Sequence, residues 1–95
     1  MSAKPIPGSA ADRNLRRCFD AAEAIKTFLA RKRGVGVTEV FFADLPYPEH
    51  LVDLLVDLRH WGRHVGVNYD TADRLARRRY AQEFREEIPQ PHLQE

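Results

Sequence analysis

Three side chains in the middle of the chain have the spacing of metal ligands. Asp57, His60 and His64 fall within about 60° of one side of a helix, together with Asp53. Two imidazoles four residues apart on a helix can reach one ion. The same spacing also suits a solvent-exposed Asp–His pair. Because no further Cys or Glu completes a ligand set of three or four, we expect no metal at these residues.

A second set of side chains is suited to binding anions. Arg74, Arg78 and Arg85 fall within a narrow arc of a helix, and Arg77 lies beside them. The arginine fork donates two hydrogen bonds at once to a carboxylate or phosphate. Arg59 and Arg63, on the preceding helix, complete the predicted contact set. The alternative is a solvated helix face whose charges are offset by nearby acids, here Asp73, Glu83, Glu86 and Glu87.

Catalysis has little support in the sequence. Gly34 and Gly36 are too close together, and lack the preceding strand, for a phosphate-binding loop. Cys18 falls on an apolar helical stripe and is expected to be a small core residue. No Ser–His–acid spacing is present. We therefore predict a non-enzymatic protein without a cofactor.

The sequence predicts three helices and one strand. A first helix is expected over about residues 9–33, with Ser9 as its N-cap and Gly34 after its end. Residues 35–42, VGVTEVFF, are rich in β-branched and aromatic side chains and predict a short strand. A lone strand leaves its backbone unpaired, so we expect either pairing with a second copy in a homodimer or an extended segment on the helices.

Two further helices form a predicted C-terminal hairpin. One begins near Pro48 and runs to about Val65, and the other is capped by Asp70 or Asn68 and runs to about Glu87. Apolar positions recur at helical spacing in all three helices, and we expect these stripes to form the core. The stripes are Leu15, Cys18, Phe19, Ala22, Ile25 and Leu29; Leu51, Leu54, Leu55, Leu58, Trp61 and Val65; and Ala72, Leu75, Ala76, Tyr80 and Phe84.

Composition places the chain among small soluble proteins. It has 95 residues, a net charge of +1 and a single cysteine. These values predict one mainly α domain over residues 9–88, between a flexible arm (1–8) and a flexible tail (89–95). No apolar run approaches the roughly 20 residues that span a bilayer, so we expect no membrane partner. With no signal peptide and no disulfide pair, the cytoplasm is the expected location.

The helical hairpin resembles two kinds of DNA-binding domain. The first resemblance is to helix-turn-helix domains. The residues that follow their spacing are Trp61, Gly62, Val65, Gly66, Val67, Ala72 and Leu75. Residues 37–80 are similar to ribbon-helix-helix regulators in the order of their elements. These elements are a strand, Leu45-Pro46, a helix, a turn at Gly66 and a second helix. That family implies a dimer with a shared ribbon. The first helix of the pair is about one turn longer than in that family, and the strand contributes Glu39 where such ribbons carry basic or amide side chains.

A third of the chain also resembles small phage- and plasmid-borne bacterial proteins of unassigned function. The matching positions are Asp57, Leu58, His60, Trp61, Gly66, Asp70, Ala72, Ala76 and Tyr80. The resemblance implies a mobile-element origin, and such proteins often dock on host machinery, including defence complexes. We therefore predict a binding module that docks on an acidic protein surface through its arginines, with DNA-binding regulation as the alternative.

Overall fold

The first helix forms where the sequence predicts it. In the computed structural model, which describes residues 4–88, α1 spans Ala10–Arg33. The Ser9 hydroxyl accepts a hydrogen bond from the Asp12 N–H at 3.2 Å, which satisfies one of the free donors of the first turn. Gly34 ends the helix in the left-handed region (φ 70°), a conformation that glycine adopts without steric cost.

The predicted strand is wrong: the segment after α1 folds into two short 3₁₀ helices, η1 (Val37–Glu39) and η2 (Phe42–Asp44). The Glu39 carboxylate accepts from the Gly36 N–H at 2.8 Å, and the Asp44 carboxylate accepts from the Phe41 N–H at 3.2 Å. These local bonds satisfy backbone groups that a lone strand would leave unpaired. No strand occurs within residues 4–88, so the ribbon expected from ribbon-helix-helix regulators is absent there.

The buried core lies where this segment packs back on α1. Leu29, Ala30 and Val40 are buried, with Val40 only 1% exposed. Ile25, Phe28 and Leu45 pack around them and are partly buried. The segment that the sequence assigns to a strand therefore supplies a central core residue instead.

The C-terminal hairpin has the predicted bounds. Helix α2 spans Pro48–Val65 and begins with proline in its first turn, where no N–H is needed. Helix α3 spans Tyr69–Glu87, and of the two predicted caps it uses Asn68, whose side chain accepts from the Thr71 N–H at 3.0 Å. Gly66 (φ 81°) ends α2. A Cβ on Gly62 would lie 3.0 Å from the Val67 carbonyl oxygen, so the turn requires glycine there or a local shift.

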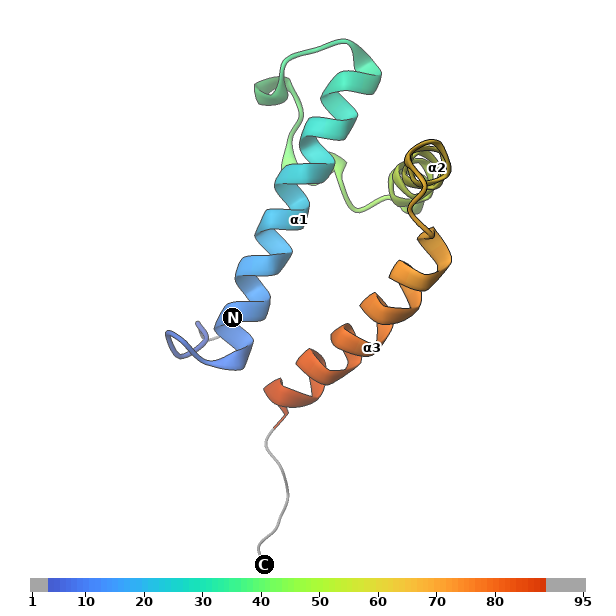
Figure 1. Ribbon diagram of the computed structural model, residues 1–95. Helices are drawn as coiled ribbons and strands as arrows, with labels where there is room; N and C mark the ends of the chain where they lie inside the picture. Colours follow the sequence, from blue (N-terminus) through green and yellow to red (C-terminus); the bar gives the residue numbers. More distant parts are fainter. Residues whose placement is uncertain (1–3, 89–95) are drawn as a thin grey trace, which may run out of the picture.

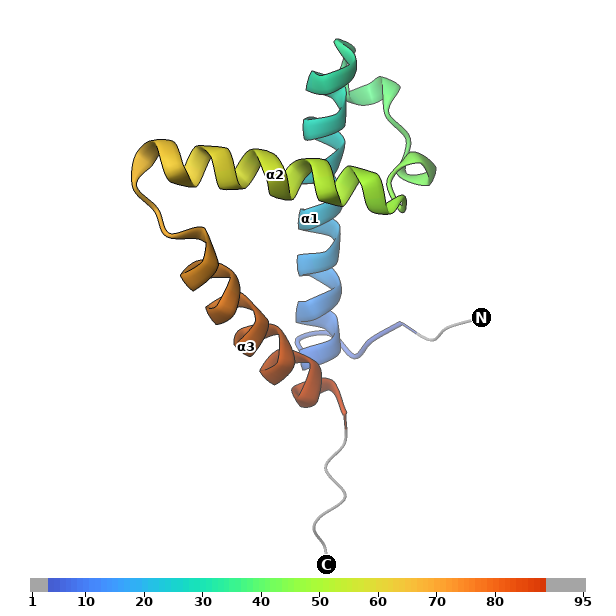
Figure 2. The ribbon, with the colours of Figure 1, turned by 90° about the vertical axis from the view of Figure 1, so that its right-hand side faces the viewer.

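The three helices outline an open triangle in Figure 2, and Figure 1 shows α2 end-on beside α1. In Figure 2, α2 crosses α1, and α3 returns from the turn toward the N-terminal end of α1. Lys32 of α1 pairs with Asp57 of α2 at 2.7 Å, and Arg17 of α1 pairs with Glu83 of α3. The helices thus touch at limited points rather than along their lengths.

Because of this arrangement, most of the predicted core is exposed. Five large apolar side chains of the predicted inner stripes are each more than one third exposed: Leu15, Phe19, Trp61, Leu75 and Phe84. Cys18 is exposed as well, contrary to its predicted place in the core. Within residues 4–88 the only buried hydrophobic side chains are Leu29, Ala30 and Val40. The helical periodicity is therefore correct, but the apolar faces do not close on one another in the single chain.

The arm expected at the N-terminus is irregular where it is described. Residues 4–8 form neither helix nor strand, and they are tied to α1 by the Gly8 N–H, which donates to the Asp12 carboxylate at 3.0 Å. Residues 1–3 and the predicted tail (89–95) lie outside the described residues. Of the helices described, none combines the length and the apolar character that crossing a bilayer requires.

Candidate interaction surface

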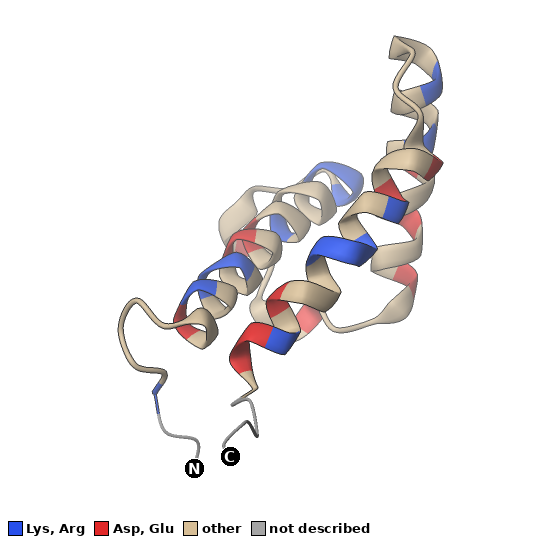
Figure 3. Ribbon diagram, turned by 60° about the horizontal axis from the view of Figure 1, so that its bottom comes forward, with Lys and Arg blue, Asp and Glu red and all other residues tan. Residues whose placement is uncertain are grey.

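The predicted arginine set on α3 forms an exposed surface. We call Arg74, Arg78 and Arg85 the Arg stripe, since helical geometry places them on one side of α3. All three are exposed, and none forms an ion pair with another residue of the range 4–88. Figure 3 shows basic residues along the middle of α3 and acidic residues toward its C-terminal end.

The acids expected to offset this stripe are mostly engaged elsewhere. The Asp73 carboxylate pairs with Arg77 at 3.5 Å. Glu83 pairs with Arg17 of α1, and the Glu87 carboxylate accepts from the Asn14 side-chain amide at 2.8 Å. Two of the four acids therefore turn toward α1 and a third toward Arg77. The charge of the Arg stripe is left less compensated than the linear sequence indicates.

Arg59 belongs to the fold rather than to the free surface. Its guanidinium pairs with Asp70 at 2.9 Å and lies 4.3 Å from the centre of the Tyr69 ring. These contacts fasten the end of α2 to the first turn of α3, beside the tight approach at Gly62. Arg63 differs: it forms no ion pair within residues 4–88, and with His60, Trp61 and His64 it lines a shallow surface depression.

The predicted metal-ligand spacing does not produce a ligand cluster. Asp57 faces α1 and pairs with Lys32, whereas His60 and His64 lie on the exposed depression beside Trp61. Across the described part of the chain, no group of three or more His, Cys, Asp or Glu side chains could hold a metal ion. Asp57 is therefore engaged with Lys32, and only the two histidines share the depression.

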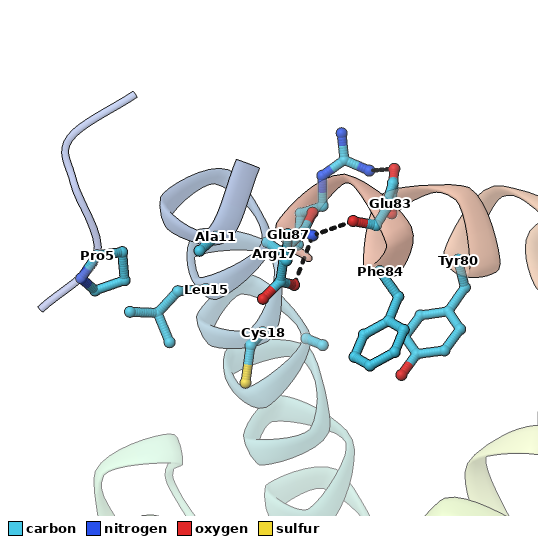
Figure 4. Close-up of a pocket in the computed structure, with 11 residues that line it drawn as sticks. Pro5, Ala11, Leu15, Arg17, Cys18, Tyr80, Glu83, Phe84 and Glu87 are labelled. Carbon is cyan, nitrogen blue, oxygen red and sulfur yellow. Dashed lines mark hydrogen bonds and ion pairs between the residues drawn. The ribbon is translucent and has the colours of Figure 1, made fainter. Parts of the chain in front are cut away.

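A groove between α1 and α3 was not predicted from the sequence. It has a volume of about 570 Å³ and lies between Leu15 and Cys18 of α1 and Tyr80 and Phe84 of α3. Figure 4 shows the Tyr80 and Phe84 rings side by side; their centroids are 6.3 Å apart and the rings are nearly parallel. Helical periodicity places these four residues on inner stripes, but it cannot show that two helices remain apart there.

Polar contacts join α1 and α3 along this groove. The Asn14 amide donates to the Glu83 carbonyl oxygen at 3.0 Å and to the Glu87 carboxylate, while Arg17 pairs with the Glu83 side chain. The partners lie 66 to 73 residues apart in the chain. No local sequence signal could have identified this cluster.

The sequence matches no protein-family model, and comparisons with curated proteins and with solved structures found no similar protein.

Proposed function

We propose that the chain is a non-enzymatic binding module that docks, through the Arg stripe of α3, on an acidic surface of a protein partner. The observation that carries this proposal is the weak compensation of the charges of Arg74, Arg78 and Arg85. They remain exposed and without ion pairs in the described range, while three of the four acids expected to offset them engage Arg77 or α1. Free arginine forks on a regular helix are suited to carboxylates at fixed spacing.

Arg77 and Arg63 extend this surface in different ways. Arg77 is exposed at the side of the stripe and holds Asp73 by an i,i+4 pair, which an exposed position makes weak. Arg63 has no ion pair among the described residues. Arg59 is excluded from the proposed surface because its guanidinium is used within the fold. The working set is thus Arg74, Arg78 and Arg85, with Arg63 and Arg77 at its edge.

DNA binding is the second candidate, and one observation favours it. Asp70 and Asp73 open the helix that a helix-turn-helix protein places in the major groove, where bare carboxylates would be repelled by phosphates. In this fold Asp70 pairs with Arg59 and Asp73 pairs with Arg77. The pairs lower that repulsion and leave the Arg stripe available to backbone phosphates.

The deciding experiment is affinity capture from the natural host, with and without nuclease, followed by binding measurements on the purified partner. Each buried charge-assisted contact contributes about 1.5–3 kcal/mol. Arg74→Ala combined with Arg78→Ala should therefore weaken protein binding by at least about 100-fold. The matched control removes two charges from another exposed helix turn, by Arg13→Ala combined with Arg16→Ala, and should bind like the wild type.

The outcomes separate the two candidates. Capture that survives nuclease and is lost only in the Arg74/Arg78 variant supports protein docking. Capture that nuclease abolishes, together with a duplex shift that weakens steeply as salt rises, supports the DNA-binding alternative. Equal binding by both double variants would remove the Arg stripe from either function.

A further inference from the structure

One face of α2 carries an apolar seam that the single chain leaves about half exposed. Leu51, Leu55, Leu58, Trp61 and Val65 fall within about 120° of the helix. They are between 37% and 57% exposed. Steps of four, three, three and four residues separate them, which keeps them on one side of the helix. Asp57, which contacts α1, lies outside this arc. Leu54 and Gly62 lie inside it and are covered, Gly62 by the turn at Val67, while the five seam residues around them stay more than one third exposed.

The chain as a whole exposes more surface than a folded monomer of its size. Its accessible area is 7917 Å², whereas a compact monomer of 11.0 kDa exposes about 5,600 Å². If the ten residues outside the described range are assigned the area of a fully unfolded chain, about 1,100 Å² of the excess remains. Two copies together carry about 2,200–4,600 Å² of such excess over all their helices, and obligate dimers bury areas of this size.

The order of residues along α2 identifies the occupant as a second copy of the same helix. The apolar set is symmetric about Leu58: Leu51 and Val65 lie seven residues to either side, and Leu55 and Trp61 lie three. An antiparallel pair with its two-fold axis at Leu58 places each of these residues opposite an apolar residue of the second copy. A two-fold interface requires such a self-complementary surface.

The charged side chains of α2 lie away from the seam. The acids Glu49, Asp53 and Asp57 lie in its first half, and Arg59 and Arg63 lie in its second half. All five lie about 100° or more from Leu58 around the helix, so a second copy packed on the seam buries none of these charges. The net charge of +1 per chain adds little repulsion between two copies.

We infer that the protein is a homodimer in which two α2 helices pack antiparallel through the seam of Leu51, Leu55, Leu58, Trp61 and Val65. This dimer differs from the one expected through a shared strand, since it uses a helix face. It does not rest on the proposed docking function, because the Arg stripe lies on α3 and takes no part in the seam. Such a dimer carries two Arg stripes.

Light scattering on the full chain tests the inference directly. The wild type is expected at about 22 kDa, twice the 11.0 kDa of one chain. Leu58→Asp places a charge on the axis, where it meets its own copy, and the mass should halve. Val52→Asp is the matched control, since Val52 is 54% exposed on the same helix but lies about 120° away from Leu58. This control should remain dimeric.

Disulfide mapping in a Cys18→Ser background fixes the orientation and does not depend on the folding of the Leu58 variant. A mixture of Leu51→Cys and Val65→Cys chains should cross-link only if the helices are antiparallel. Val65→Cys alone should cross-link to itself only if they are parallel. Any of four results would overturn the inference. They are a monomeric wild type at about 100 μM, a dimeric and folded Leu58→Asp variant, a monomeric Val52→Asp variant, and Val65→Cys chains that cross-link to themselves.

Discussion

Replacing Arg59 should weaken the junction between α2 and α3, although the sequence places this residue among the partner-binding arginines. Its guanidinium pairs with the Asp70 carboxylate at 2.9 Å and lies over the Tyr69 ring at 4.3 Å. Both partners belong to the first turn of α3. Arg59 therefore joins two helices whose other close approach is the backbone contact at Gly62.

The expected loss follows from the exposure of the two groups. The side chains of Arg59 and Asp70 are 55% and 76% exposed, so their ion pair contributes only about 0.2–1 kcal/mol. An exposed cation–π contact contributes about 0.5–1 kcal/mol. Arg59→Ala should thus lower the free energy of unfolding by about 1 kcal/mol, and Asp70→Asn, which removes only the ion pair, by about 0.5 kcal/mol.

Urea unfolding followed by circular dichroism measures this loss. With a slope of about 1–2 kcal/mol per M, Arg59→Ala should move the midpoint down by about 0.5–1 M. All samples are compared at one protein concentration, because the unfolding of an oligomer depends on it. Arg63→Ala is the matched control and should stay within about 0.5 kcal/mol of the wild type. Equal midpoints for the Arg59 and Arg63 variants would refute the proposed junction.

Three further predictions test the fold. Val40 is 1% exposed, so Val40→Ala should cost about 2 kcal/mol in urea unfolding. Val37→Ala, at a 39% exposed position, should cost less than about 0.5 kcal/mol; the reverse order would contradict the 3₁₀ packing. Asn68→Ala should lower the thermal midpoint through a loss of about 1 kcal/mol, and an unchanged midpoint would mean that another residue caps α3. Cys18 is exposed and should be modified completely by a thiol reagent in native buffer; protection until denaturant is added would place it in a core.

Helix positions could be predicted from the sequence because their signals are local. Ser9 and Gly34 bracket α1, Pro48 and Gly66 bracket α2, and Asn68 starts α3. Each of these residues acts through its own φ angle or through a bond to a neighbour three or four residues away. The segment at 37–42 was misjudged, because β-branched content indicates how well a side chain suits a sheet but not whether a partner strand exists.

The candidate surface was only partly accessible to sequence reasoning. Periodicity is sufficient to place the Arg stripe on one side of a helix. Whether its charge is compensated depends on which residues Glu83 and Glu87 contact. Their partners lie on α1, more than 60 residues away in the chain. Arg59 and Arg63 look equivalent in the sequence, yet only Arg59 is held by the first turn of α3.

The sequence by itself determined the helices, their caps and their apolar and charged faces, since these follow from residue type and a period of 3.6. Only the tertiary structure decided which apolar faces are buried. Val40 lies in the core against Leu29, while Trp61 is left 57% exposed on α2. The physical reason is that burial depends on how the helices cross. After the short turn at Gly66, α3 runs toward the N-terminal end of α1 rather than along α2 (Figure 2).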